Sequence, residues 1–213
     1  MNDDFWHQCW EKNEIGFHEG KPNELLMSNF NTFKSILSGN RLFVPLCGKT
    51  IDIHWLLKKG FHVVGVELSE IAINDLFKNL NITPEINYTD QISHYKGPNI
   101  DVFVTNIFNL NSQIIGNING IYDRAALVAL PKNIRTTYAQ HLKAITNNAP
   151  QLLITFDYNQ ELNNGPPFSI PESEINRLYS SNYTMSLLES KHTTVNSNIM
   201  HESIYLLMQL PSI

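Results

Sequence analysis

The chain has 213 residues, 42% of them apolar and 10% aromatic, so it is large enough to bury a sizeable core. Charged residues make up only 16%, and 15 basic against 20 acidic side chains give a formal net charge of −5. This composition argues against intrinsic disorder. It also argues against a nucleic-acid partner, because tracking a phosphate backbone calls for clustered Lys and Arg.

The start of the chain, Met1-Asn2-Asp3-Asp4, is acidic and lacks the basic residues and apolar stretch of a signal peptide. No apolar run approaches the ~18–20 residues of a transmembrane helix. We therefore expect a cytoplasmic protein without a membrane partner, and a monomer is the default for this size. Cys9 and Cys47 are too few for a disulfide framework. No His or Cys pair has the spacing of metal ligands, so we expect no metal site.

The first 40 residues predict helices, because apolar residues recur at helical spacing in their second half. A short apolar run of strand length follows at 41–46 and is broken by a turn at 47–50. A helix predicted at 51–59 leads to a second apolar run, rich in β-branched residues, at 61–66.

Glu67 ends this second run, and Ser69 is a suitable N-cap for a helix at 70–80. The order strand, glycine turn, helix, strand, acid, helix is typical of the opening of a parallel, doubly wound α/β sheet. The alternation continues with strands at 100–105, 120–123 and 151–157 and helices at 131–148 and 171–181. Two strand-like runs without a helix between them, 183–189 and 203–210, predict an antiparallel hairpin at the sheet edge.

The turn after the first strand is the first place to look for a ligand, because open parallel sheets bind ligands at the carboxyl ends of their strands. Gly48-Lys49-Thr50 resembles the end of a Walker A loop, but the glycine needed five residues earlier is Phe43, which disfavours a nucleotide triphosphate. A dinucleotide keeps some support, because Glu67 lies 19 residues after Gly48, where a ribose-binding acid is expected. However, GxGxxG is absent. S-adenosylmethionine has a ribose and no phosphate, so it needs only that acid and one close backbone approach.

Several motifs, spread from about residue 5 to about residue 171, resemble the thiopurine S-methyltransferase family, and its bacterial branch in particular. They are Phe5-Trp6-His7-x-x-Trp10, Ile15-Gly16-Phe17-His18, Pro45-Leu46-Cys47-Gly48-Lys49, Val64-Gly65-Val66-Glu67-Leu68-Ser69, the run from Asp123 to Leu130, and Gly165-Pro166-Pro167-Phe168. The resemblance implies a Rossmann-like, seven-stranded class I methyltransferase sheet, in agreement with the strand count above, and S-adenosylmethionine as cofactor. We therefore expect one domain over residues 1–213, with residues 1–40 forming a helical lid.

The resemblance also implies a set of cofactor-binding residues, namely Trp10, Phe17, Leu46, Gly48, Glu67, Asn106, Ile107 and Arg124. In this set Glu67 would bind the ribose, and the backbone of Leu46 and Gly48 would contact the methionine portion. Asn106 and Ile107 lie where the family contacts adenine. Many methyltransferases have an acid there and this chain has none, so backbone groups or the Asn106 amide would hold the adenine.

Two further roles follow from the resemblance. Trp10 and Phe17 would belong to an aromatic segment that folds over the cofactor, although their helix-like spacing is equally typical of core residues. Arg124 would be the active-site arginine beside both cofactor and substrate, and Asp123 would orient it. Arg124 and Asp123 are therefore the candidate catalytic residues.

The implied activity is transfer of the methyl group of S-adenosylmethionine to the sulfur of small aromatic or heterocyclic thiols, leaving S-adenosylhomocysteine. Such thiols lose a proton near neutral pH, so alignment matters more than a strong base, and a cation such as Arg124 would stabilise the thiolate. The sequence leaves selenium, tellurium or halide acceptors open. A nucleotide-binding or sensor protein without catalysis and a NAD-dependent oxidoreductase also stay open.

Overall fold

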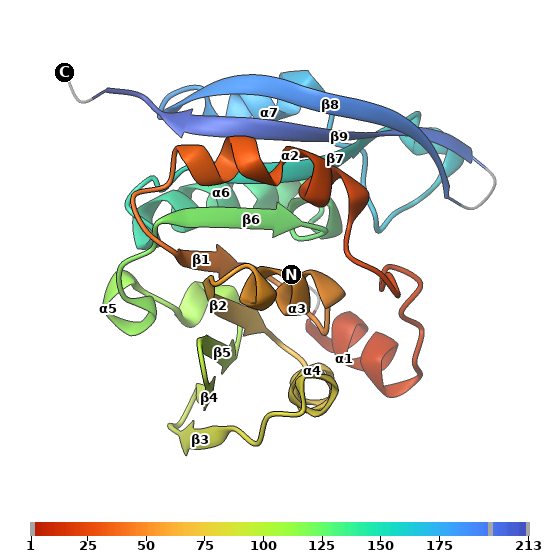
Figure 1. Cartoon of the computed structure of the whole chain (residues 1–213). Coiled ribbons are helices and arrows are strands. Elements are labelled where there is room, and N and C mark those ends of the chain that lie inside the picture. The colour runs from red at the N-terminus through yellow and green to blue at the C-terminus, as the bar shows by residue number, and fades with distance from the viewer. Residues whose placement is uncertain (1–2, 196–197, 212–213) are drawn as a thin grey trace.

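The structure of the chain is a computed structural model that describes residues 3–195 and 198–211. One mixed sheet runs through the molecule, and helices cover both of its faces (Figure 1). The strands are β1 (Arg41–Val44), β2 (His62–Glu67), β3 (Glu85–Tyr88), β4 (Ser93–Gly97), β5 (Ile100–Val104), β6 (Gly120–Arg124), β7 (Gln151–Asp157), β8 (Tyr183–Val195) and β9 (Asn198–Gln209). The α/β class predicted from the sequence is confirmed.

The order across the sheet is β3-β4-β5-β2-β1-β6-β7-β9-β8. The five central strands, from β5 to β7, are parallel to one another. Each end of the sheet is closed by an antiparallel pair, β9 and β8 beside β7 and β4 and β3 beside β5. The antiparallel hairpin predicted near the end of the chain is therefore present at one edge.

The number of strands differs from the prediction, because within residues 3–195 and 198–211 the sheet has nine strands and not seven. All seven predicted strands are present, and the additional two are β3 and β4. The sequence of β3 is polar and its residues are largely exposed, while in β4 only Tyr95 is buried, so neither strand carries an apolar repeat. The terminal hairpin is also longer than predicted, because β8 continues to Val195 and β9 begins at Asn198.

The helices follow the predicted alternation and leave two apolar layers, one on each face of the sheet. They are α1 (Asp3–Glu11), α2 (Glu24–Ser35), α3 (Ile51–Lys58), α4 (Glu70–Leu80), α5 (Ser112–Ile115), α6 (Lys132–Ile145) and α7 (Glu172–Tyr179). Successive residues of a strand point to opposite faces. Leu42 and Val44 accordingly pack with α2, α3 and α4, whereas Phe43 packs with α5, α6 and α7. Ser69 caps α4 as predicted, since its side chain accepts a hydrogen bond from the backbone N–H of Ala72.

The segment 1–40 has two parts with different surroundings. Helix α2 presents Leu25, Leu26, Phe30 and Phe33 to the core, and each is at most 3% exposed. Helix α1 buries only Cys9 and Trp10 and lies near the carboxyl ends of the parallel strands (Figure 1). Within the segment that was expected to form a lid, α2 therefore belongs to the packed layer. Helix α1 and the loop after it lie over the carboxyl ends of the parallel strands.

Among the helices of the described residues, none combines the length and apolar content that crossing a membrane requires.

Candidate active site

A cavity of about 600 Å³ lies at the carboxyl ends of the parallel strands, within the usual range for small-molecule sites. Four of the parallel strands contribute to its wall, through the loop 46–50 after β1, Glu67 at the end of β2, Arg124 at the end of β6 and Phe156 in β7, and the antiparallel strand β9 adds Glu202. From outside the sheet, α1 and the loop that follows it close the opposite side. The strand ends thus converge on the place where the sequence predicted a ligand.

The loop after β1 makes a sharp turn at the cavity wall. Leu46 and Gly48 both adopt left-handed backbone conformations, with φ of 46° and 50°. A Cβ atom added at Gly48 would stand 3.0 Å from a ring carbon of Trp10. Gly48 is therefore required on two grounds, the positive φ and the approach of the Trp10 ring.

Glu67 lies in the floor of the cavity with only 7% of its surface exposed. One carboxylate oxygen, Oε2, accepts from the backbone N–H of Gly48 at 2.9 Å, and Oε1 accepts from Leu68 at 2.8 Å and Ser69 at 3.0 Å. Burial raises the pKa of Glu67, and these three backbone donors oppose that shift. An ionised carboxylate offers about four acceptor positions, so Glu67 can still accept a hydroxyl donor from a ligand.

Aromatic side chains from the N-terminal segment cover the loop after β1. Trp10 and Phe17 meet edge to face with ring centroids 5.5 Å apart, and Trp6 meets Phe17 in the same way at 5.7 Å. The Nζ atom of Lys49 lies 5.7 Å from the Trp10 ring centroid and 2.7 Å from the Asp75 carboxylate. The cluster gives the cavity an apolar, aromatic side, on which a planar ligand can pack.

Arg124 is held by the loop that follows α1. Its Nη1 donates to the backbone carbonyl of Phe17 at 3.1 Å, and its Nη2 forms a hydrogen-bonded ion pair with the Glu19 carboxylate. The Arg124 side chain is 10% exposed and that of Glu19 is 38% exposed. A guanidinium and a carboxylate thus stand side by side in the cavity wall.

His18 and Cys47 also line the cavity, and burial shifts the pKa of both side chains. Desolvation lowers the pKa of His18, and the positive charges of Lys49 and Arg124 lower it further. Burial raises the pKa of the Cys47 thiol well above its usual range, and the Glu67 charge adds to this shift. At neutral pH the imidazole is therefore neutral and the thiol is protonated, so Cys47 is not an activated nucleophile.

Six of the predicted site residues line this one cavity, namely Trp10, Phe17, Leu46, Gly48, Glu67 and Arg124. Three others lie outside its wall. Asp123 is fully buried, and its oxygens accept from the Tyr138 hydroxyl at 2.7 Å and the Leu127 backbone N–H at 3.1 Å. These partners are on the α6 side of the sheet, whereas those of Arg124 are in the N-terminal loop.

Asn106 and Ile107 also lie outside the cavity wall. The Asn106 side chain caps the short turn Ile107–Asn109, accepting from the backbone N–H of Phe108, and donates to Asp3 Oδ2 at 2.9 Å. This contact links helix α1 to the end of β5. Asp3 of α1 thus brings a carboxylate next to Asn106, in the segment after β5 that has no acid of its own. The adenine-binding roles of Asn106 and Ile107 stay a prediction.

The cavity wall includes residues that sequence reasoning did not assign to the site. Glu19 directly follows the Phe17-His18 motif, and only this place in the sequence could have indicated that it belongs to the site. Glu202 of β9 is a carboxylate at the start of a long apolar run, where one strand residue of this kind carries no recognisable pattern. Pro166 and Pro167, quoted above as part of a motif, also line the cavity.

Among residues 3–195 and 198–211, no three His, Cys, Asp or Glu side chains are grouped so as to hold a metal ion.

The family model of thiopurine S-methyltransferase matches residues 1–208 of the chain. A curated relative of that name from Teredinibacter turnerae is 47% identical over 191 residues, which cover 90% of this chain and 88% of the relative. Another from Xanthobacter autotrophicus is 46% identical and covers 89% of each.

Solved structures share the fold at low sequence identity. The 1,6-didemethyltoxoflavin-N1-methyltransferase of Burkholderia thailandensis, solved with 1,6-didemethyltoxoflavin and S-adenosylhomocysteine, superposes with a TM-score of 0.68 at 12% identity, over 97% of this chain and 87% of that one. A SAM-dependent methyltransferase of Anabaena variabilis gives 0.66 at 14% identity, over 97% and 95%. At this low sequence identity the two structures show that the fold is shared, and nothing more.

Proposed function

Since this chain belongs to the thiopurine S-methyltransferase family, we propose that it transfers the methyl group of S-adenosylmethionine to the sulfur of small aromatic or heterocyclic thiols. The chain is a methyltransferase that depends on S-adenosylmethionine, which supplies an activated methyl group on a sulfonium sulfur. The proposal therefore concerns the acceptor and the residues that act on both substrates.

The cavity wall offers groups that match the ribose and the methionine portion of the donor. Glu67 would accept the ribose hydroxyls, because its carboxylate is already oriented by three backbone donors and has acceptor capacity left. The tight turn at Leu46 and Gly48 would let backbone atoms approach the methionine portion. Trp10 and Phe17 would cover the bound donor.

We assign the acceptor to the part of the cavity near Arg124. Methyl transfer from a sulfonium is a direct displacement, so the protein mainly aligns the two sulfur atoms and excludes water. The guanidinium of Arg124 would stabilise negative charge on the acceptor sulfur, and the neighbouring aromatic rings would stack on a planar acceptor. Asp123, which lies behind the wall on the same strand, would act on Arg124 only through the backbone of β6.

The single observation that carries the proposal is the convergence of Gly48, Glu67 and Arg124 on one aromatic-lined cavity. These residues come from three different strand ends. The hydrogen bond from the Gly48 N–H to Glu67 joins the glycine turn and the acid whose spacing predicted a ribose site.

Calorimetric titration with S-adenosylmethionine, NAD and ATP tests the cofactor site. We expect S-adenosylmethionine to bind and Glu67→Gln to weaken that binding at least about tenfold, since a hydrogen bond to a charged group contributes about 1.5–3 kcal/mol. Glu85→Gln on the exposed edge strand β3 is the matched control and should bind normally. Tight binding of NAD alone would contradict the proposal.

A panel of aromatic thiols, selenols, tellurium species and halides then tests the acceptor. We expect the thiols to give the highest kcat/KM. Donor binding without turnover on any thiol would favour a sensor protein, and faster turnover of halide or selenium species would move the acceptor class away from thiols.

A further inference from the structure

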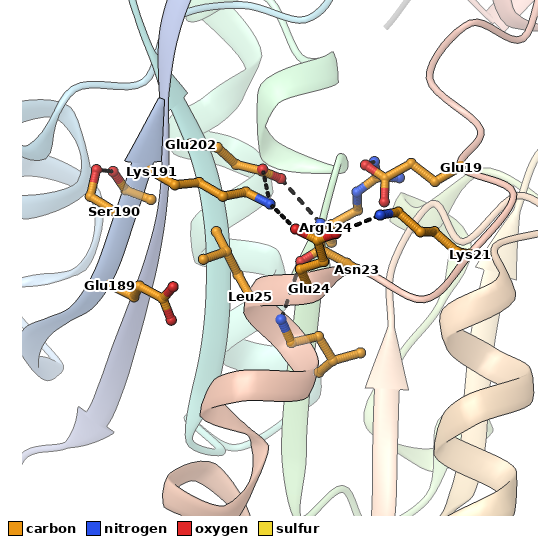
Figure 2. Close-up of polar contacts among 12 residues, drawn as sticks. Glu19, Lys21, Asn23, Glu24, Leu25, Arg124, Glu189, Ser190, Lys191 and Glu202 are labelled. Carbon is orange, nitrogen blue, oxygen red and sulfur yellow. Dashed lines mark hydrogen bonds and ion pairs between the residues drawn. The ribbon is translucent and has the colours of Figure 1, made fainter. Parts of the chain in front are cut away.

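Glu19 and Arg124 form an ion pair in the cavity wall, yet the proposed function uses only the arginine. Figure 2 shows the two side chains next to each other. The same view shows Lys191 of β8 in contact with Glu24 of α2 and Glu202 of β9. Glu19 is the more exposed partner, at 38% against 10% for Arg124. A bound acceptor that reaches the guanidinium would therefore also reach the carboxylate.

Four carboxylates line the cavity, and they differ in what they can do. Glu67 is held by three backbone N–H groups, and the proposed function assigns its remaining acceptor capacity to the ribose. Glu202 is 4% exposed, pairs with Lys191 at 3.3 Å and accepts from Asn23 at 3.1 Å. Figure 2 shows the contact between Glu202 and Lys191 as a dashed line. Glu14 is exposed, and the ion pair of Arg124 is made with Glu19. Glu19 is thus the accessible carboxylate that stands beside the cation.

The pair presents a hydrogen-bond donor next to an acceptor. A guanidinium only donates and an ionised carboxylate only accepts, so the complementary ligand has an acceptor atom beside an N–H donor. A heterocyclic thione has this pattern, because its C=S sulfur is adjacent to a ring N–H. A simple arenethiol lacks the N–H group.

Such a thione must lose its N–H proton, or methylation at sulfur would leave a positive charge on the ring. Transfer of that proton needs an acceptor within hydrogen-bond reach of the ring N–H. Glu19 stands at the position that the N–H would face if the sulfur faced Arg124. The geometry therefore supplies a partner for each of the two atoms.

We propose, building on S-methyl transfer as the function, that Glu19 is a catalytic residue that accepts the ring N–H proton of heterocyclic thione substrates. As the N–H bond breaks, its electron pair forms the ring C=N bond and the C=S π pair moves to sulfur. A sulfur lone pair forms the new bond to the methyl carbon, and the electron pair of the broken methyl–sulfonium bond stays on the donor sulfur. The proton leaves Glu19 for water, so the products are the S-methyl heterocycle, S-adenosylhomocysteine and one proton.

The test compares Glu19→Gln with the wild type on two acceptors. Pyridine thione has a ring N–H beside the C=S carbon, and nitro-substituted benzenethiol is an ionised thiolate without a ring N–H. We expect the variant to lose about 100-fold in kcat/KM on the thione, the scale of general base catalysis, and to stay within about twofold on the thiolate. Glu19→Asp should recover part of the loss, and binding of S-adenosylmethionine should be unchanged.

Two further variants make the outcome decisive. Glu11→Gln, an exposed position on α1 outside the cavity wall, makes the same chemical change and should match the wild type on both acceptors. An equal loss on both acceptors in Glu19→Gln would mean that Glu19 only positions Arg124 and would overturn the proposal. So would a thione-selective loss in His18→Gln instead. If the wild type methylates the thiolate but not the thione, the role of Glu19 is refuted and S-methyl transfer stands. If the wild type methylates neither acceptor, S-methyl transfer itself is refuted.

Discussion

Gly48 shows how a single residue sets the shape of the cavity. Its φ of 50° belongs to the left-handed region, and a Cβ atom there would stand 3.0 Å from the Trp10 ring. The Gly48 N–H also donates to Glu67. A change at this position would therefore disturb the turn, the aromatic cover and Glu67, the acid that we propose to bind the ribose.

We expect Gly48→Ala to reduce the affinity for S-adenosylmethionine by about tenfold. The left-handed conformation costs a residue with a Cβ about 1–2 kcal/mol, so the turn of the free variant relaxes to another conformation, and the ligand must restore the binding conformation at that cost. Gly20→Ala is the matched control, because no atom lies within 4 Å of the added Cβ and its φ is not in that region. Titration calorimetry on both variants measures the effect. Equal affinities for the two variants would refute the role given to Gly48.

Asp123 makes a pH-dependent contribution to stability. Burial raises its pKa to about 6, against the lowering effect of hydrogen bonds from Tyr138 and Leu127. Between about pH 4 and 6 the native state therefore holds a proton that the unfolded chain has lost. The free energy of unfolding contributed by this group falls as pH rises through that window.

Asp123→Asn is neutral at every pH and lacks this decline. We expect the difference in unfolding free energy, variant minus wild type, to increase by about 2 kcal/mol from pH 4 to pH 7. Urea unfolding at several pH values measures it, and any hydrogen bond lost in the variant changes the difference by a constant. Parallel pH curves for the two proteins would show that Asp123 does not titrate in this window.

At the level of the elements, α1 and α2 differ in how firmly they are attached. Helix α1 buries only two side chains, whereas α2 packs four apolar side chains into the core. We propose that α1 and the loop after it act as the lid over bound donor. Few buried contacts are what allow a segment to open at low free energy.

Hydrogen exchange followed by mass spectrometry tests this division. We expect S-adenosylmethionine to slow amide exchange in α1 and to leave α2 unchanged. The Glu67→Gln protein at the same ligand concentration is the control and should show little protection in α1. Equal protection of both helices would assign the whole segment 1–40 to the lid.

The elements that the sequence revealed are those with an apolar repeat. The β3–β4 hairpin was missed because its polar, largely exposed residues have no core-facing pattern. Nine of the 26 Asn residues occupy two kinds of position that suit this residue. Asn side chains cap helices or turns at 23, 106, 111 and 159, and Asn adopts a positive φ at 13, 81, 99, 147 and 148. Both are positions that Asn tolerates better than most residues.

For the whole molecule, the strand order explains where the cavity lies. After β1 the chain builds the sheet outward through β2 toward β5, and later crosses to the other side of β1 through β6 and β7. The loops after β1 and β6 therefore diverge and leave a crevice at the strand ends. The sequence predicted this crevice from the alternation of strands and helices.

The contacts that cross the crevice could not be predicted from the sequence. Arg124 meets Glu19 across 105 positions, and Asn106 meets Asp3 across 103. Such pairs depend on how the N-terminal segment folds back over the sheet, and no local pattern records that path. Glu67 and Gly48 were predictable because their spacing belongs to one strand–turn–helix–strand unit.

The most direct test of the central claim is to follow the methyl group itself. The protein is incubated with S-adenosylmethionine carrying an isotope-labelled methyl group and a heterocyclic thione, and the product is examined by NMR. We predict that the label is found on the acceptor sulfur, with S-adenosylhomocysteine formed in equal amount. Label on a ring nitrogen, or S-adenosylhomocysteine without a labelled acceptor, would contradict S-methyl transfer.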